Sequence, residues 1–209
     1  MKGKIRAARP PNAGKIGWLP PRKLHMGLRE IVTLPDPILR RKARPVSAFD
    51  KSLQVLIDDM IETMRAAPGV GLAAPQVGAS ERLIVVEYAE PPEVAEPAEG
   101  TETAPVEPAP PVKPKLYVVA NPEIVKASAD MTVGVEGCLS IPGLVGEVER
   151  HTTLHIKGLN RRGQPMKIKA EGWLARIFQH EIDHINGVVF PDRATKLWKP
   201  EPDEVEDRV

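Results

Sequence analysis

Residues 172–186 read GWLARIFQHEIDHIN, and this stretch decides how the chain folds. Its apolar residues recur around most of a helical circumference, which predicts a buried helix over Gly172–Asn186. Gly187 supplies the signal that ends it. Positions four apart share one face of a helix, so His180 and His184 can both turn a ring nitrogen toward one metal ion.

The same stretch contains a candidate base as well as two candidate ligands. Glu181 lies next to His180 in an HExxH pattern, within reach of a metal-bound water. A catalytic site usually takes three protein ligands and keeps one position open. The alternative is a buried helix whose histidines make ordinary hydrogen bonds. A third ligand must therefore come from elsewhere in the chain.

Composition limits the classes of protein that the chain can belong to. The 209 residues include 29 basic and 28 acidic ones, a balance that argues against a DNA or membrane partner for the chain as a whole. No apolar run approaches the roughly 20 residues that cross a bilayer. A single cysteine, Cys138, excludes an internal disulfide and fits a reducing, cytoplasmic location.

Three segments differ from the rest of the chain. Residues 1–27 carry seven Lys or Arg and no acid, which predicts a disordered basic arm rich in Pro and Gly. Residues 89–114 hold eight Pro and six Glu, which predicts a disordered, solvated loop insertion; a ligand for a proline-recognising domain is the alternative. Residues 196–209 are expected to form an acidic tail. Residues 28–195 are then expected to form one domain.

Hydrophobic periodicity predicts the remaining elements. A helix is expected at about 50–66, ending at Pro68-Gly69. Strands are expected over 82–88, 116–125, 148–159 and 166–170, with a turn at 160–163 between the last two. Strands followed by a buried helix predict an α+β fold, in which mixed or antiparallel sheets pack around a central C-terminal helix that carries the metal ligands, with one further N-terminal helix.

Two other short segments carry residues suited to chemistry. In GVGLAAPQ (69–76) the glycines let backbone approach a ligand, and Gln76 can donate to a developing oxyanion; a plain Gly/Pro loop is the alternative. In EGCLS (136–140), Cys138 lies in a tight turn and not in an apolar run, which favours a ligand over a core residue. One thiolate and two imidazoles form a set that Zn²⁺ and other divalent transition metals accept.

Taken in order, GVGLAAPQ, EGCLS and QHEIDH (179–184) resemble the three signature motifs of peptide deformylases. Residues 34–40, LPDPILR, are also similar to that family, and the resemblance covers about 28–195 apart from the insertion. It implies Glu181 as the general acid/base, with Gln76 and the backbone N–H of Leu139 holding the formyl oxygen. It implies as metal ligands Cys138, His180 and His184.

The resemblance also implies an activity, a cofactor and partners. The family removes the formyl group from the N-formyl-methionine of newly made polypeptides and releases formate. One divalent metal ion is expected, usually Fe²⁺, with Zn²⁺ as the alternative. Nascent formyl-methionyl peptides are the expected partners, and the basic arm of residues 1–27 is expected to contact ribosomal RNA.

Some predictions concern how the substrate and the ligands are held. The substrate backbone is expected to lie as an added strand against Gly69, Val70 and Gly71. Trp173 and Ile177, on the face of His180, are candidates for the lining of an apolar methionine slot, with ordinary core packing as the alternative. A further prediction is a buried charge cluster that orients the ligands, formed by Glu136, Arg150 and Asp183.

Two other functions compete with deformylation. A generic HExxH metallopeptidase usually finds its third ligand after the helix, but no His or Cys follows His184. A catalytically inactive, metal-stabilised binding module would have a fourth protein ligand or a lost catalytic group. The chain has no second cysteine, and both Glu181 and Gln76 are present.

Overall fold

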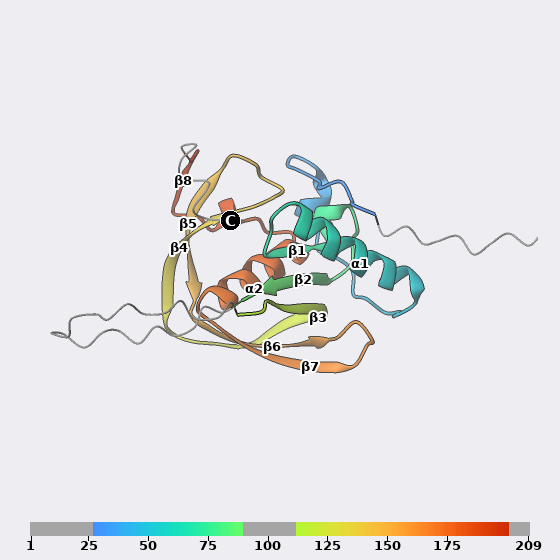
Figure 1. Ribbon diagram of the computed structural model, residues 1–209. Helices are drawn as coiled ribbons and strands as arrows, with labels where there is room; N and C mark the ends of the chain where they lie inside the picture. Colours follow the sequence, from blue (N-terminus) through green and yellow to red (C-terminus); the bar gives the residue numbers. More distant parts are fainter. Residues whose placement is uncertain (1–26, 90–111, 201–209) are drawn as a thin grey trace, which may run out of the picture.

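The computed structural model describes residues 27–89 and 112–200, which form an α+β fold of two α-helices and eight strands (Figure 1). The helices are α1 (Lys51–Ala66) and α2 (Gly172–Ile185). The strands are β1 (Gly71–Ala73), β2 (Leu83–Tyr88), β3 (Lys115–Ala127), β4 (Met131–Gly137), β5 (Val145–His151), β6 (Thr153–Leu159), β7 (Pro165–Glu171) and β8 (Lys196–Trp198). The predicted fold class is confirmed. No helix in the described ranges is long and apolar enough to span a membrane.

The strands form two antiparallel sheets. One has five strands in the order β1-β2-β3-β6-β7, and the other has three in the order β4-β5-β8. The larger sheet is covered on both faces. Ile84 and Val86 of β2 pack in the cluster that contains α2, whereas Leu83 and Val85 pack in the cluster that contains α1. This alternation is the two-residue period of a strand, and it explains why β2 is apolar at successive positions.

Both predicted helices are confirmed to within one residue. Asp50 caps α1, since its side chain accepts from the N–H groups of Ser52 and Leu53. Asn186 ends α2, and Gly187 follows with φ of +77°, a backbone region that glycine enters without strain. The β6–β7 hairpin is also confirmed, with its turn at 160–163.

One predicted strand is wrong. Residues 148–159 form no single strand, because β5 and β6 belong to different sheets and the chain passes between them at Thr152. The N–H of Thr152 donates to Asp130 and its carbonyl accepts from Gly172, so its backbone groups leave the strand ladder. This bend brings the smaller sheet around the start of α2.

The fold also differs from the predicted segments elsewhere, and β4 was not predicted. The predicted strand at 116–125 is longer, as β3. The segment 69–76, for which a plain loop was the alternative, holds β1 and the start of a short 3-10 helix (Ala74–Val77). Residues 196–198, predicted to belong to an acidic tail, form β8 and pair with β5. The predictions for 1–26, 90–111 and 201–209 lie outside the described residues.

Candidate metal centre

Three predicted ligands, one directly after β4 and two on α2, come together in the structure. Cys138 follows directly after β4, and His180 and His184 lie one turn apart on α2. The Nε2 atom of His184 is 3.2 Å from Sγ of Cys138 and 3.2 Å from Nε2 of His180. All three ligand atoms lie within 4.8 Å of one another. The HExxH segment thus forms a cluster with the only cysteine in the chain.

The cluster fits a tetrahedral metal ion with an open position. Metal–sulfur and metal–nitrogen bonds of the usual lengths put neighbouring ligand atoms about 3.3 to 3.6 Å apart, close to the distances found here. The group of candidate ligands among the described residues contains three members and no fourth. Three protein ligands leave one coordination position for water or substrate, as in catalytic zinc sites.

A buried carboxylate fixes the orientation of the first histidine. Glu136, at the end of β4, accepts from Nδ1 of His180 at 3.0 Å, which leaves Nε2 of that ring for a metal ion. Burial raises the pKa of Glu136, but hydrogen bonds from His180 and Arg150 outweigh burial and lower that pKa to about 2. Glu136 is therefore a carboxylate at neutral pH.

The predicted charge cluster is present and contains two further arginines. Arg150 binds both oxygens of Glu136 at 2.9 Å and Oδ2 of Asp183 at 2.6 Å. Arg176 donates to Glu136 at 2.9 Å, and Arg193 binds both oxygens of Asp183. Sequence reasoning missed Arg176 and Arg193. Position 176 offered a signal, since it lies four residues before His180 on a helix predicted to be buried.

The two histidines differ in protonation. Burial opposes protonation of His180, but its hydrogen bonds with Cys138 and Glu136 outweigh burial and raise the pKa of His180 well above its usual value. Burial, together with the charge of His180, lowers the pKa of His184 well below the usual value. A metal ion has to displace the proton from His180, whereas the ring of His184 is already neutral.

Gln76 contacts the cluster, and Glu181 follows His180 on α2. Glu181 is 4% exposed, its Oε2 has no hydrogen-bond partner in the described structure, and burial raises its pKa to about 7. Gln76 donates from Nε2 to Sγ of Cys138 at 3.6 Å. Its Oε1 accepts from the N–H of Ala73 at 2.8 Å, which fixes the amide with its NH₂ group toward the cluster.

The glycine-rich segment lies against the same groups. A Cβ added at Gly71 would lie 2.4 Å from Oε1 of Glu181, so the carboxylate occupies the space that a side chain would need. A Cβ at Gly69 would lie 3.0 Å from Leu139. Val70 is 40% exposed between them. No described carbonyl accepts from the N–H of Leu139, so this donor is available to a ligand.

The two candidates for the methionine slot lie in different surroundings. Ile177 is buried in the cluster between α2 and the larger sheet. Trp173 is 46% exposed, with the guanidinium of Arg176 5.8 Å from its ring centroid. Arg176 in turn binds Glu136, which contacts His180. Trp173 is thus connected to the metal cluster through two buried side chains.

Comparisons with known proteins agree on one family. A family model described as polypeptide deformylase matches residues 28–199. A peptide deformylase from Symbiobacterium thermophilum is 48% identical over 172 residues, which cover 82% of this chain and 69% of the relative. The crystal structure of peptide deformylase from Thermotoga maritima has a TM-score of 0.66 at 39% identity and covers 81% of this chain and 99% of that chain. A class I type b peptide deformylase from Acinetobacter baumannii, solved with Met-Ala-Ser bound, has a TM-score of 0.67 at 35% identity, covering 80% and 99%.

Proposed function

The chain belongs to the polypeptide deformylase family, and on that premise we propose how its residues remove the formyl group from the N-terminal formyl-methionine of newly made polypeptides. The observation that supports the proposal is the cluster of Cys138, His180 and His184, with Glu181 and Gln76 beside it. A relative solved with a peptide that begins with methionine agrees with this substrate class.

The family is metal-dependent, and we propose that Cys138, His180 and His184 hold one divalent ion, Fe²⁺ rather than Zn²⁺. When bound, the ion supplies the Lewis acidity that makes water a nucleophile near neutral pH. The charge network contributes orientation, because Glu136 accepts from His180 and is itself held by Arg150 and Arg176.

Glu181 transfers the proton in this proposal. Its Oε2 is buried and free of other hydrogen bonds, and its pKa of about 7 is matched to the acceptance and release of a proton near neutral pH. Glu181 takes a proton from the water that attacks the formyl carbon and delivers it to the leaving amine. Formate and a free N-terminus are the products.

Gln76 and Leu139 hold the formyl oxygen as negative charge develops on it. The Nε2 group of Gln76 is fixed by the bond between Oε1 and Ala73, and the Leu139 N–H has no other acceptor in the described chain. A donor that is already oriented costs no reorganisation when the charge appears. Each such donor lowers the activation free energy by about 3 kcal/mol.

The substrate backbone is proposed to lie along the edge of the larger sheet. β1 pairs with β2 on one side only, and residues 69–71 lead into this edge. Main-chain hydrogen bonds to an edge strand bind peptides of varied sequence, as an enzyme for many nascent chains requires. The methionine slot formed by Trp173 and Ile177 remains a prediction.

Location and ribosome contact also remain predictions. A cytoplasmic location fits a free Cys138 that is needed as a thiolate ligand. Contact with ribosomal RNA through the arm of residues 1–27 concerns a segment of which the structure describes only Gly27.

The test is formate release from a formyl-Met-Ala-Ser peptide by protein loaded with Fe²⁺ without oxygen. Wild-type protein is expected to release formate, and Glu181→Ala is expected to lose activity by at least 100-fold while it keeps one metal ion per chain. Equal rates for the two proteins would refute the role of Glu181. Protein loaded with Zn²⁺ and assayed beside it tests the proposed metal.

A further inference from the structure

The first half of β3 has one edge that no other strand covers. β3 pairs with β2 over residues 115–120, whereas its pairing with β6 begins only at Ala120. Residues 115–119 therefore have a neighbouring strand on one side alone within the described chain. We call this side of residues 115–119 the open edge. A strand edge without a neighbour presents N–H and C=O groups that can pair with another chain.

The strand register shows which backbone groups point to the open edge. The N–H of Glu87 donates to Val70, so the odd-numbered residues of β2 turn their backbone groups toward β1 and the even-numbered ones toward β3. Tyr117 lies opposite an even-numbered residue of β2 and bonds to it, so Leu116 and Val118 turn their N–H and C=O groups the other way. These four groups have no hydrogen-bond partner among the described residues.

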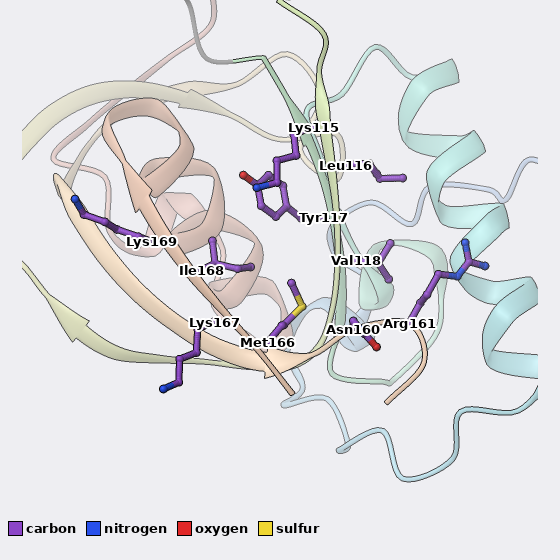
Figure 2. Close-up of a pocket in the computed structure, with 10 residues that line it drawn as sticks. All are labelled: Lys115, Leu116, Tyr117, Val118, Asn160, Arg161, Met166, Lys167, Ile168 and Lys169. Atoms are coloured by element: carbon purple, nitrogen blue, oxygen red, sulfur yellow. The ribbon is translucent and has the colours of Figure 1, made fainter. Parts of the chain in front are cut away.

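A hollow of about 420 Å³ lies along the open edge (Figure 2). Residues 115–118 of β3 line it without a gap in the sequence. Since successive side chains point to opposite faces of a strand, a lining of consecutive residues places part of the hollow at the edge of β3. Residues 166–169 of β7 form the opposite wall. The hollow has the volume of sites that bind small ligands or short pieces of chain.

The tip of the β6–β7 hairpin leaves this space open because the tip is held by another element. Arg161 donates to Asp58 of α1 at 2.8 Å and to Oε1 of Gln54 at 2.9 Å. The carbonyl of Arg161 accepts from Gln54 at 2.8 Å. A Cβ added at Gly163 would lie 2.9 Å from the ring of Phe49, which precedes α1. The turn therefore contacts α1, and β6 does not continue along residues 115–119.

The side chains beside the open edge define the chemistry of a strand that could pair there. Leu116 is 36% exposed, and Tyr117 and Val118 are only partly buried against the two core clusters. The ammonium of Lys115 lies 4.7 Å from the ring centroid of Tyr117 and has no carboxylate partner in the described chain. None of the residues that line the hollow is acidic. Three apolar side chains followed by an acidic one would match these neighbours.

The open edge and the metal cluster lie on opposite sides of α2. Tyr117 packs against Phe178 of α2, with ring centroids 5.5 Å apart. Residues two apart on a helix point about 200° apart, so His180 faces away from Phe178. Figure 1 shows β6 and β7 on one side of α2 and β8 on the other. A strand bound at the open edge leaves the metal cluster accessible.

We propose that the open edge binds an extended segment of a partner protein, which adds a strand beside β3. The segment runs antiparallel to β3, with apolar side chains opposite Val118, Tyr117 and Leu116 in turn and an acidic side chain opposite Lys115. Main-chain hydrogen bonds to Leu116 and Val118 give affinity, and the side chains beside them give selectivity. The proposal rests on the geometry of β3 and does not depend on the proposed function.

Hydrogen exchange of single backbone amides in the full-length, metal-loaded chain tests whether the edge is open. The amides of Leu116 and Val118 are expected to exchange at least about 100-fold faster than those of Tyr117 and Val119, which donate to β2. Slow exchange of all four amides in the free protein would show that another part of the chain, or a second copy, already covers the edge. That result would overturn the proposal.

Binding is measured by fluorescence anisotropy with a fluorescein-labelled peptide, Ser-Val-Tyr-Val-Glu-Ser. Lys115→Gln in the protein and Glu to Gln in the peptide should each weaken binding about threefold. The two changes together should weaken it no more than either alone, because they remove the same ion pair. Lys126→Gln, farther along β3, is the matched control and should change the affinity by less than about twofold.

A second variant tests the main-chain bonds. Leu116→Pro removes an N–H of the open edge and none that donates to β2, so it should weaken binding at least about fivefold with formate release unchanged. If this variant does not fold, a peptide N-methylated at the valine before the glutamate, which faces Leu116, replaces it. N-methylation at the tyrosine, whose N–H faces away from β3, is then the control.

Three results of these binding measurements would overturn the proposal. The first is no binding at about 5 mM peptide, a concentration above the weakest dissociation constant expected of a specific contact. The second is equal weakening by Lys115→Gln and Lys126→Gln. The third is unchanged binding to Leu116→Pro or, in its place, equal effects of the two N-methylated peptides.

Discussion

Replacing Glu136 with Gln is expected to destabilise the protein strongly, because this carboxylate balances buried positive charge. In the network, three arginines (Arg150, Arg176 and Arg193) surround two carboxylates, Glu136 and Asp183. The side chains of Glu136 and Arg150 are each only 4% exposed. Without Glu136, one carboxylate would remain for three guanidinium groups.

Two independent arguments give the same magnitude. Lowering the pKa of Glu136 from 4.5 to about 2 corresponds to about 3 kcal/mol in favour of the charged form in the folded state. Removal of one member of a buried ion pair typically costs about 3 to 5 kcal/mol. We therefore expect Glu136→Gln to lower the free energy of unfolding by about 3 kcal/mol at pH 7.

Urea unfolding of the metal-free protein, followed by tryptophan fluorescence, measures this loss. With a slope of about 2 kcal/mol per molar urea, the midpoint should fall by about 1.5 M. Glu149→Gln, an exposed position on the same strand as Arg150, is the control and should change stability by less than about 0.5 kcal/mol. A midpoint shift below 0.5 M, or equal shifts for both variants, would refute the reasoning.

The same variant should change the acid limb of the stability curve. Since the folded pKa of Glu136 lies below its unfolded value, its contribution is complete above pH 4.5 and is lost as the pH falls toward 2. Wild-type protein should therefore lose about 3 kcal/mol more than Glu136→Gln across this interval. The affinity for Zn²⁺, measured by competition with a chelator, should fall 10- to 100-fold, because His180 loses the acceptor that orients it.

Three other outcomes are expected from the same site. Glu181→Gln should stabilise the metal-free protein by at most about 3 kcal/mol above pH 7 and by much less below pH 4.5. Burial raises the pKa of Glu181 from 4.5 to about 7, so the folded state must bury a charged carboxylate only at the higher pH. Urea unfolding at pH 4 and pH 8 checks this, and an equal effect at both would contradict it. Gly71→Ala should reduce formate release about 100-fold with metal content unchanged, since the new methyl group would lie 2.4 Å from Oε1 of Glu181 and must displace this carboxylate. Unchanged activity would show that the Glu181 carboxylate can move aside and still transfer the proton. The affinity for Zn²⁺ should rise about tenfold between pH 6 and pH 7, because the metal displaces a proton from His180, whose pKa is raised well above its usual value. An affinity that does not change with pH in competition experiments would contradict a protonated His180 in the metal-free protein.

The parts of the fold that follow from local pattern were predictable. α1 and α2 have helical periodicity and end signals within their own sequences, and the β6–β7 hairpin has its turn residues in place. β4 has no such signal, because its apolar side chains Met131 and Val133 point to solvent and its pairing with β5 alone defines it. The change of sheet at Thr152 depends on hydrogen bonds to Asp130 and Gly172, which are distant in sequence.

The candidate site was predictable where one residue type fits few roles. Two histidines four apart and a single cysteine in a tight turn limit the chemistry through residue type and spacing alone. The position of Arg176 on a helix predicted to be buried was a weaker signal, because an arginine on a helix usually reaches solvent. Here Gly134 leaves the space for it, since a Cβ at that glycine would lie 2.8 Å from the guanidinium carbon.

The shortness of β1 limits how much of any peptide the enzyme can read. A free edge of three residues offers main-chain hydrogen bonds to only about three residues of an added strand. A longer polypeptide therefore makes no further hydrogen bonds to β1. Cleavage should then be indifferent to the length and later sequence of the substrate. The same short edge also limits pairing with a second copy of the chain. The protein therefore has an edge strand open to a peptide but too short to promote aggregation.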